Sequence, residues 1–282
     1  MDLTSPKVIR SIQEKFGFTF KKGLGQNFLT SQTVLEDIAG AAEIETGVIE
    51  IGPGFGVLTS QLAARSQKVL AIEIDERLID VLNYTLSEFD NIKIINADIL
   101  KLDLKSLIQK EFNGGQISIA ANLPYYITTP IITKLLEEKL PVRNIVVMVQ
   151  KEVAERMSAM PGTKDYGAIT VLCRYYTEPS VITNVKASLF VPPPKVDSAV
   201  LKLRVLDKPS VEVLNEKLFF KVVRAAFSQR RKTLLNCLCS AFPIPKPEMS
   251  ALLEKNDIHP ARRGETLSPE EFAVIADAIA NN

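Results

Sequence analysis

The chain has 282 residues, of which 46% are hydrophobic, enough for one large domain or for a large and a small one. Lys and Arg total 34 against 33 Asp and Glu, so the overall charge indicates no class of partner. Three cysteines argue against a disulfide framework, and together with one histidine they are badly spaced for a structural zinc site. We therefore expect a folded globular protein without a metal centre.

Targeting and membrane segments are not evident in the sequence. The chain shows no charged start followed by an apolar region, as a secretory signal would. No apolar run approaches the roughly 20 residues of a membrane-spanning helix. We expect a soluble, cytoplasmic protein that does not associate with a membrane.

The first 30 residues are basic and contain the glycine-punctuated stretch "KKGLGQNFL" at 21–29. The basic residues outnumber Asp2 and Glu14; they are Lys7, Arg10, Lys15, Lys21 and Lys22. From 31 to 46 apolar residues recur at helical spacing, which predicts a helix with Ser31 or Thr33 as its N-terminal cap.

Short apolar runs then alternate with amphipathic stretches. The runs predict five strands, at 47–52, 68–75, 92–98, 117–122 and 145–150. The stretches between them predict helices, among them 58–65, 76–88 and 129–139. This alternation is typical of βαβ units, and it predicts an α/β fold with a parallel sheet covered on both faces.

The pattern changes after residue 157. The stretches "SVITNVKASLF" and "SAVLKLRVL" predict two further strands, joined by the proline-rich "VPPPKV". Beyond "DKPS" at 207–210 the chain predicts helices only. We expect residues 1–206 to form one α/β domain and residues 207–282 a small helical domain.

The stretch "VIEIGPGFGVLT" at 48–59 predicts a strand, a glycine-rich turn and the start of a helix. Glycines permit a tight turn and let the backbone approach a ligand. Gly52, Gly54 and Gly56 give G-x-G-x-G, and Val57 stands where a dinucleotide fingerprint has its third glycine. By itself this pattern is a weak signal of a ligand site, and a tight βα connection that binds nothing is the less favoured alternative.

Acids at two successive strand ends strengthen the ligand hypothesis. Glu73 follows the first glycine by about 20 residues, where a carboxylate accepts ribose hydroxyls, and Asp98 ends the next strand, within reach of an adenine amino group. The carboxyl ends of parallel strands meet at one edge of the sheet, where ligands bind. The pattern predicts an adenosine site that does not require a pyrophosphate.

The stretch "AANLPYYITTP" at 120–130 ends an apolar run in an amide, a proline and two tyrosines. Adenine N6 is a poor nucleophile because its lone pair is delocalised into the ring. A side-chain amide oxygen and a backbone carbonyl can accept hydrogen bonds from its two N–H groups, which favours a pyramidal nitrogen with its lone pair directed at an electrophile. Pro124 would stiffen the turn that presents the acceptors, and Tyr125 could stack on a base removed from its helix. The alternative is a strand that ends in an Asn122–Pro124 turn with core tyrosines.

A basic segment without acids runs from Lys217 to Lys246. Four of its cations fall at one helical spacing, with two more beside them, and this predicts a phosphate-binding surface. The four are Lys217, Lys221, Arg224 and Arg231, and the two are Arg230 and Lys232. The opposite side of that helix, with Phe219 and Val222, is expected to pack on the domain.

Seven stretches in order make the chain resemble the KsgA family, the small-subunit (16S) ribosomal RNA adenine dimethyltransferases. They are "KKGLGQNFL", "IEIGPGFGVLT", "AIEID", "NADIL", "NLPYYIT", "LFVPPPKVDSAVL" and "AAFSQRRKTLLN". The resemblance implies a Rossmann-like S-adenosylmethionine-dependent methyltransferase domain with a small C-terminal helical, RNA-binding domain. It implies transfer of methyl groups to N6 of two adjacent adenines near the 3′ end of small-subunit rRNA. The implied partner is an assembling 30S-type subunit, bound by a monomer.

The resemblance also implies roles for individual residues. Asn27, Leu29, Gly52, Gly54, Glu73, Asp98 and Asn122 would bind S-adenosylmethionine. Asn122, Leu123, Pro124 and Tyr125 would form the catalytic turn. Tyr125 would stack on the target adenine, and Phe190 would cover its other side.

Three alternatives remain open at this point. The macrolide-resistance methyltransferases share a motif like "NLPY" but modify large-subunit rRNA. Only the "PPPKVDSAV" and "FSQRRKTLLN" stretches favour the KsgA family over them. An RNA-binding assembly factor without methylation is the second alternative, against which the intact acids argue. A NAD-dependent oxidoreductase is disfavoured by the glycine spacing.

Overall fold

The computed structural model describes residues 1–19 and 27–282, which divide into two compact units. One unit comprises Met1–Ala154 and Pro179–Val205, and the other comprises Glu155–Glu178 and Leu206–Asn282. The single division expected after residue 206 therefore missed the segment 155–178, which belongs to the second unit. Within the described residues, no helix is long and apolar enough to cross a membrane.

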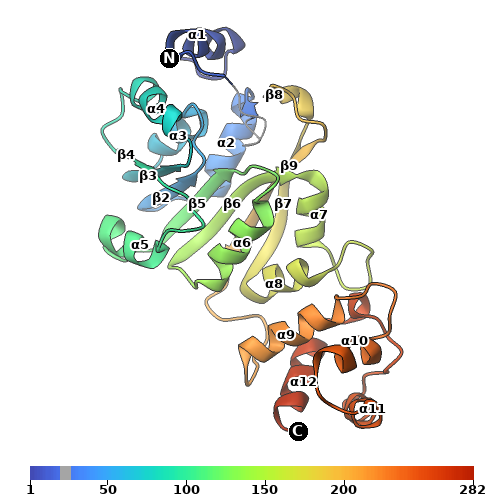
Figure 1. Cartoon of the computed structure of the whole chain (residues 1–282). Helices are drawn as coiled ribbons and strands as arrows, with labels where there is room; N and C mark the ends of the chain where they lie inside the picture. Colours follow the sequence, from blue (N-terminus) through green and yellow to red (C-terminus); the bar gives the residue numbers. More distant parts are fainter. Residues whose placement is uncertain (20–26) are drawn as a thin grey trace. The chain divides into compact units, whose positions relative to one another are not determined.

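A seven-stranded sheet forms the centre of the first unit, with the strand order β4-β3-β2-β5-β6-β9-β7 (Figure 1). The strands from β2 to β6 are parallel to their neighbours, and β9 is antiparallel to β6. The bounds are β2 Gly47–Ile51, β3 Lys68–Glu73, β4 Ile92–Asn96, β5 Ile117–Asn122, β6 Val142–Gln150, β7 Thr177–Val185 and β9 Ser198–Val205. All five strands predicted for the parallel part are confirmed, with ends shifted by up to three residues.

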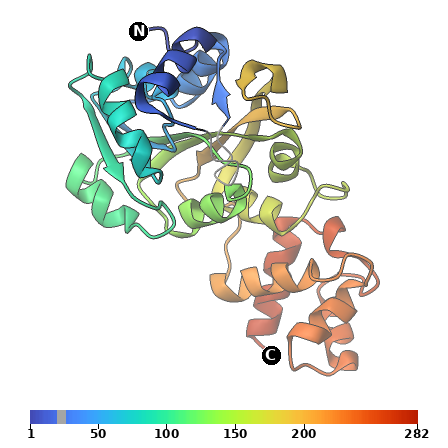
Figure 2. The ribbon, with the colours of Figure 1, turned by 45° about the horizontal axis from the view of Figure 1, so that its top comes forward.

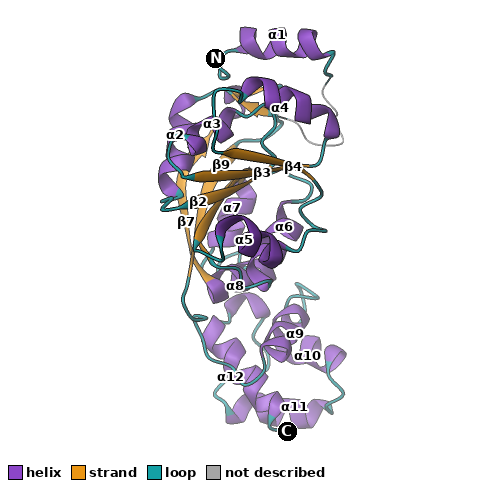
Figure 3. Ribbon diagram, turned by 90° about the vertical axis from the view of Figure 1, so that its left-hand side faces the viewer, coloured by secondary structure: helices purple, strands orange, loops and turns teal. Residues whose placement is uncertain are grey.

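Helices cover both faces of this sheet, as Figure 3 shows edge-on. On one face lie α2 Gln32–Ala41, α3 Val57–Ala63 and α4 Ile79–Thr85, the last preceded by the 3₁₀ turn η2 Glu76–Leu78. On the other face lie α5 Leu104–Phe112 and α6 Thr128–Glu137. Every residue of β2 is buried, which explains why the central strands are continuously apolar rather than alternating. Ser31 accepts a hydrogen bond from the backbone N–H of Val34 and so caps α2 as expected.

The order of the strands places a reversal between β2 and β5. From β2 the chain moves outward through β3 to β4, and then returns to add β5 on the opposite side of β2. The connections that leave these two neighbouring strands therefore diverge, which leaves a crevice at their carboxyl ends. Gly52 follows β2 at this point, and Asn122 is the last residue of β5.

A smaller ladder and an N-terminal helix complete the first unit. The helix α1 spans Pro6–Phe16, and β1 Phe28–Leu29 pairs antiparallel with β8 Phe190–Val191, which follows the turn η3 Ala187–Leu189. Phe28 stacks on Phe55 of the glycine-rich turn with ring centroids 4.2 Å apart. Phe18 contacts Phe55 edge-on, so aromatic contacts connect both of these N-terminal stretches to the turn.

The second unit is helical. Its helices are α8 Ala168–Tyr176, α9 Glu216–Ala226, α10 Leu234–Ala241, α11 Lys246–Lys255 and α12 Pro269–Ala280, with the turn η4 Gly264–Thr266; α7 Lys151–Ser158 leads into it. Figure 2 shows the four C-terminal helices, orange to red, packed together. Tyr175 of α8 packs against Phe219 and Phe220 of α9, which places segment 155–178 in the core of this unit.

The close approach of η4 to the end of α9 yields a stability prediction. A Cβ built on Gly264 would lie 2.7 Å from the backbone oxygen of Ala226, and backbone cannot move aside as a flexible side chain can. Gly264→Ala should therefore destabilise the protein by about 1–3 kcal/mol in denaturant unfolding. Gly40→Ala in α2 is the matched control, because no atom lies within 4 Å of its Cβ position and alanine favours helix. Equal stability of the two variants would contradict this packing.

Candidate functional site

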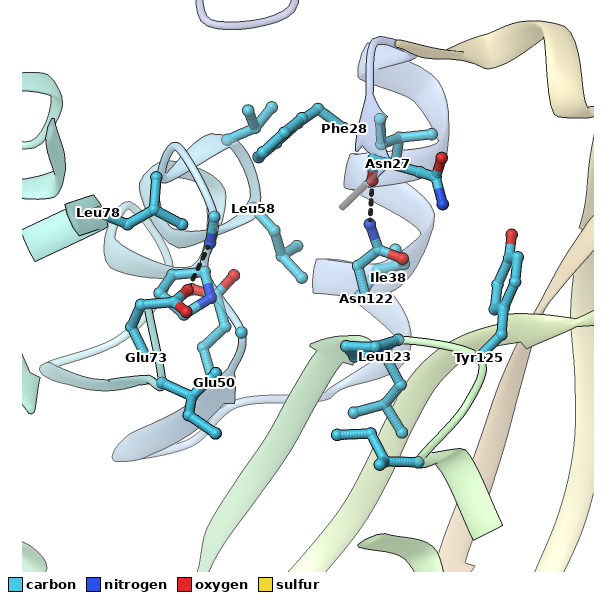
Figure 4. Close-up of a pocket in the computed structure, with 18 of the residues that line it drawn as sticks. Asn27, Phe28, Ile38, Glu50, Leu58, Glu73, Leu78, Asn122, Leu123 and Tyr125 are labelled. Atoms are coloured by element: carbon cyan, nitrogen blue, oxygen red, sulfur yellow. Dashed lines mark hydrogen bonds between the residues drawn. The ribbon is translucent and has the colours of Figure 1, made fainter. Parts of the chain in front are cut away.

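A pocket opens at the carboxyl edge of the sheet, where β2, β3 and β5 end. Its lining residues are Asn27, Phe28, Leu29, Leu35, Ile38, Glu50, Gly52, Pro53, Gly54, Val57, Leu58, Glu73, Ile74, Leu78, Asn122, Leu123, Pro124, Tyr125, Tyr126 and Ile127. Figure 4 shows Glu50 and Glu73 at one end of it, and Asn122, Leu123 and Tyr125 at the other. The pocket therefore has an acidic end and an amide–aromatic end.

The glycine-rich turn forms one wall of the pocket with its backbone. Gly52, Gly54 and Gly56 all have φ between 61° and 86°, in the left-handed region that residues other than glycine rarely adopt. A Cβ on Gly52 would meet only the backbone oxygen of Asn122, at 4.0 Å, so this residue faces open space beside β5. A Cβ on Gly54 would lie 2.8 Å from the Phe28 ring. The turn thus needs glycine both for its conformation and for close approach.

Glu73 ends β3 and is held from two sides by backbone. Its Oε1 accepts a hydrogen bond of 2.8 Å from the N–H of Asp75, and its Oε2 accepts one of 3.3 Å from the N–H of Gly54. Burial raises the pKa of Glu73, and the neighbouring charge of Asp75 adds to this, although the two N–H donors oppose it. The bonds fix the carboxylate next to the glycine-rich turn, as the sequence predicted for a ribose-binding acid.

Glu50 is a second acid in the pocket, and it was not among the site residues predicted from the sequence. Its side chain projects from β2 and is 1% exposed, and its Oε2 has no hydrogen-bond partner among the described residues. Burial raises the pKa of Glu50 to about 8; the charge of Glu73 adds to this shift, and Thr59 opposes it. The available signal was an acid inside an otherwise apolar strand, two residues before the first glycine.

Asn122 connects β5 to the segment that enters β1. Its Nδ2 donates a hydrogen bond of 3.1 Å to the backbone oxygen of Asn27, drawn as a dashed line in Figure 4. Because the amide nitrogen is used as this donor, the orientation of the amide is set and its oxygen is left as the acceptor. Asn27 and Leu29 also line the pocket, and Lys21 and Lys22 lie outside the described residues.

The turn after Asn122 is braced at each of its next residues. The N–H of Leu123 donates to the oxygen of Met148 in β6, at 3.1 Å. The oxygen of Pro124 accepts from the Thr128 hydroxyl, also at 3.1 Å. The Tyr125 hydroxyl lies 2.6 Å from the hydroxyl of Ser198, the first residue of β9. The turn is therefore fixed by backbone and side-chain bonds together.

Apolar residues that the sequence analysis did not select complete the lining. Ile74, directly after Glu73, is 51% exposed, and Tyr126 is 55% exposed. Large apolar side chains that remain this accessible at a pocket suit the flat faces of a bound base or nucleoside. Leu78, from the turn after β3, adds to the same lining.

Two predicted site residues do not line the pocket. Asp98 lies beyond β4, where its carboxylate accepts a hydrogen bond from the N–H of Leu100 and lies 3.6 Å from the Lys101 ammonium. Phe190 stays our prediction for the residue that covers a target base, but in this structure it is 2% exposed and does not line the pocket. The reason is that β8 pairs Phe190 with Leu29, and its ring joins the hydrophobic core cluster.

The predicted helical row of cations is only partly correct. Lys217, Lys221 and Arg224 are exposed on α9, and the opposite face with Phe219 and Val222 is buried. The helix ends at Ala226, so Arg231 does not continue the row. Arg230, Arg231 and Lys232 are exposed in the turn that follows, where Arg230 donates to the backbone oxygen of Lys164.

A family model described as ribosomal RNA adenine dimethylase matches residues 17–281 of the chain. The chain belongs to this family. It is 52% identical to the ribosomal RNA small subunit methyltransferase A of Bacillus cytotoxicus, covering 99% of this chain and 97% of that protein. The protein of the same name from a Geobacillus species is 51% identical, covering 99% and 98% of the two chains.

Two solved structures have the same architecture as this chain. A dimethyladenosine transferase from Plasmodium falciparum superposes with a TM-score of 0.74 at 29% identity, covering 88% of this chain and 95% of that one. The 23S rRNA methyltransferase ErmE gives a TM-score of 0.69 at 28% identity, covering 90% and 99%. The chain is thus an S-adenosylmethionine-dependent rRNA adenine dimethyltransferase with a Rossmann-like domain followed by C-terminal helices.

The residues of this dimethylase's pocket suit S-adenosylmethionine. The turn at Gly52 presents backbone to open space, which a side chain would fill. Next to it lie a fixed carboxylate at Glu73 and the exposed apolar side chain of Ile74, the groups that a ribose and an adenine require. Glu50 also lines this end of the pocket, where its buried Oε2 has no hydrogen-bond partner among the described residues.

The raised pKa of Glu50 predicts a pH-dependent stability. Because its folded pKa of about 8 lies above the ordinary glutamate value of 4.5, the native state retains a proton that the unfolded state loses between these pH values. The stability contribution of protonated Glu50 is therefore complete below that interval and decreases as pH rises through it. Glu50→Gln, which is always neutral, should lose less thermal stability than the parent chain between about pH 5 and about pH 8.5.

The control for this measurement is Glu152→Gln, at an exposed position of α7. It should follow the parent chain at every pH, because the Glu152 side chain is exposed. Parallel melting-temperature curves for the parent chain and Glu50→Gln would show that Glu50 does not hold a proton in the native state.

Proposed function

We propose that the chain transfers methyl groups from S-adenosylmethionine to N6 of two adjacent adenines near the 3′ end of small-subunit rRNA. The support is the close similarity to proteins named ribosomal RNA small subunit methyltransferase A, at 51–52% identity over nearly the whole chain. We place the reaction in the cytoplasm on an assembling small subunit, with the enzyme acting as a monomer.

The observation that carries the mechanism is the orientation of the Asn122 amide. Its nitrogen donates to the Asn27 backbone, so the oxygen is the atom available to a base in the pocket. An acceptor fixed in advance can hold an N6–H bond so that the nitrogen lone pair points at the methyl donor. The backbone oxygen of Leu123 is the proposed second acceptor, since the bond from its N–H to Met148 holds that peptide in place.

Tyr125 is the proposed stacking surface for the target adenine. Its ring lines the pocket directly after Pro124, whose oxygen is tied to α6 by Thr128. Burial raises the pKa of Tyr125, so the side chain remains a neutral phenol at neutral pH. A neutral aromatic face suits a base that has left its helix, because stacking replaces part of the lost base–base contact.

We assign the acidic end of the pocket to S-adenosylmethionine, which supplies an electrophilic methyl group when bound. Glu73 would accept hydrogen bonds from the ribose hydroxyls, and the backbone at Gly52 and Gly54 would lie against the ligand. Asn27 and Leu29 would close over it from the segment that enters β1. Asp98 remains our proposal for an adenine contact, and in this structure it lies outside the pocket lining.

The exposed cations of the second unit are the proposed RNA-backbone contacts: Lys217, Lys221, Arg224, Arg230, Arg231 and Lys232. A solvated face usually mixes charges of both signs, whereas no acid lies between Lys217 and Lys246. Binding through phosphates holds the RNA without reading its sequence, which leaves the choice of base to the pocket.

One experiment separates the small-subunit target from a large-subunit target. The enzyme is incubated with labelled S-adenosylmethionine and, in parallel, with unmethylated small subunits and with large subunits, and the label is then mapped. Label on two adjacent adenines of small-subunit rRNA supports the proposal. Label on large-subunit rRNA would favour the reaction named for ErmE, and no label would favour an assembly factor without methylation.

Asn122→Ala tests the proposed mechanism. Loss of the preorganised acceptor should lower methyl transfer by about 10²–10³-fold while the fold is retained. Asn91→Ala is the control, because the Asn91 amide also bonds to backbone, at Ala63 and Ser66, but lies outside the pocket lining. Near-normal turnover of Asn122→Ala would contradict the assignment.

Replacing Arg231 and Lys232 together tests the RNA surface without removing the Arg230 bond to Lys164. Arg231→Ala with Lys232→Ala should weaken binding to small subunits and reduce the slope of log affinity against log salt by about 1.5, since fewer counterions are released. Affinity for S-adenosylmethionine should not change. Lys105→Ala with Lys110→Ala, two exposed lysines of α5, is the control of equal charge. Equal salt slopes for the two double variants would mean that the cations of this turn are only solvated.

A further inference from the structure

We propose that Ser198 is a positioning residue for the methyl transfer, because its hydroxyl holds the ring of Tyr125 in one orientation. The two hydroxyl oxygens are 2.6 Å apart, although the residues are 73 positions apart in the chain. The inference rests on the proposed stacking role of Tyr125, and it assigns to β9 a part in presenting the target base.

Ser198 is itself held rigidly. It is the first residue of β9 and has no exposed surface, and its Cα is paired with Gln150 at the end of β6. The residue before it is fixed twice: the oxygen of Asp197 accepts from the N–H of Lys151, and its carboxylate accepts from the N–H of Ala187. The Ser198 hydroxyl is therefore a fixed point that does not follow motions of the turn after β5.

Tyr125 is attached to the protein at both ends of its side chain. At the backbone end, the bonds at Leu123 and Pro124 hold the turn against β6 and α6. At the hydroxyl end, the Tyr125 oxygen forms a hydrogen bond with the Ser198 hydroxyl. A side chain fixed at both ends cannot tilt its long axis. Because the O–H bond and lone pairs of a phenol lie near the plane of the ring, a hydrogen-bond partner in a fixed position also limits rotation of the ring about that axis before any base arrives.

The plane of this ring determines where N6 of a stacked adenine points. Dimethylation requires two successive transfers to the same nitrogen, and the second starts from a nitrogen that already carries a methyl group. Fewer orientations of the monomethylated base direct the N6 lone pair towards the donor. The second transfer therefore depends more strongly on the orientation of the Tyr125 ring. A loosened ring should slow both transfers and should let monomethyladenosine accumulate.

Ser198→Ala tests the inference on unmethylated small subunits with labelled S-adenosylmethionine. Loss of one hydrogen bond of about 0.5–1.5 kcal/mol should lower kcat about 2- to 12-fold. The ratio of monomethyl- to dimethyladenosine at equal conversion should rise, and affinity for S-adenosylmethionine should not change. The product ratio is informative because a general loss of stability would lower the amount of active enzyme without changing it.

Ser118→Ala is the matched control. Ser118 is also a buried serine of the sheet, and its hydroxyl donates to the oxygen of Ala42 at 2.6 Å, but it lies at the start of β5 and outside the pocket lining. The same atom and a bond of the same length are removed, so the cost in stability should be similar. Its kcat and product ratio should equal those of the parent enzyme.

Tyr125→Phe removes the other half of the bond and leaves the aromatic face. If the bond is the cause, Ser198→Ala, Tyr125→Phe and the double variant should show the same loss and the same product ratio. Parent-like kinetics of Ser198→Ala, or losses that add in the double variant, would overturn the inference. Tyr125→Ala distinguishes failure of the Ser198 inference from failure of the proposed stacking role of Tyr125. Full activity in that variant would refute the stacking role.

Discussion

The reversal of strand order between β2 and β5 is the constraint on which the site depends. Two parallel neighbours whose connections leave in opposite directions expose the last peptides of both strands. On one side this exposes Gly52, where the backbone can lie against a ligand, and on the other it exposes Asn122. In the proposed assignment, donor and acceptor of the transferred methyl group meet between them. Among the strands that the structure describes, no other pair of parallel neighbours has diverging connections.

The groups around this crevice are held by segments distant in the sequence. Asn122 is bonded to Asn27 across 95 positions, and Tyr125 is bonded to Ser198 across 73. Glu73 is fixed by the turn that follows β2 as well as by its own turn. A site built from long-range bonds forms only once the first unit is complete, so its geometry depends on the cooperativity of that unit.

Local patterns in the sequence were sufficient for the strands, the glycine-rich turn and the position of Asn122, because each depends on neighbouring residues. The burial of Phe190 depends on its pairing with Leu29, and the Ser198 contact depends on the antiparallel return of β9; neither leaves a local signal. The predicted helical row of cations was wrong at Arg231, because the spacing of the cations continues past Ala226 whereas the helix ends there. The acid at Glu50 was visible, but its burial follows from the position of β2 at the centre of the sheet.

The second unit is built from two separate stretches of the chain. The chain enters it after Ala154, returns to the sheet at Pro179, and enters it again after Val205. Tyr175 and Tyr176, from the first visit, share a hydrogen-bonding partner, Glu216, with the second. The C-terminal helices are therefore not a module that gene fusion could add or exchange at a single junction. An open reading frame cut after residue 206 would still encode segment 155–178 but not the helices that cover it, so loss or replacement of this part in evolution requires coordinated change at two places.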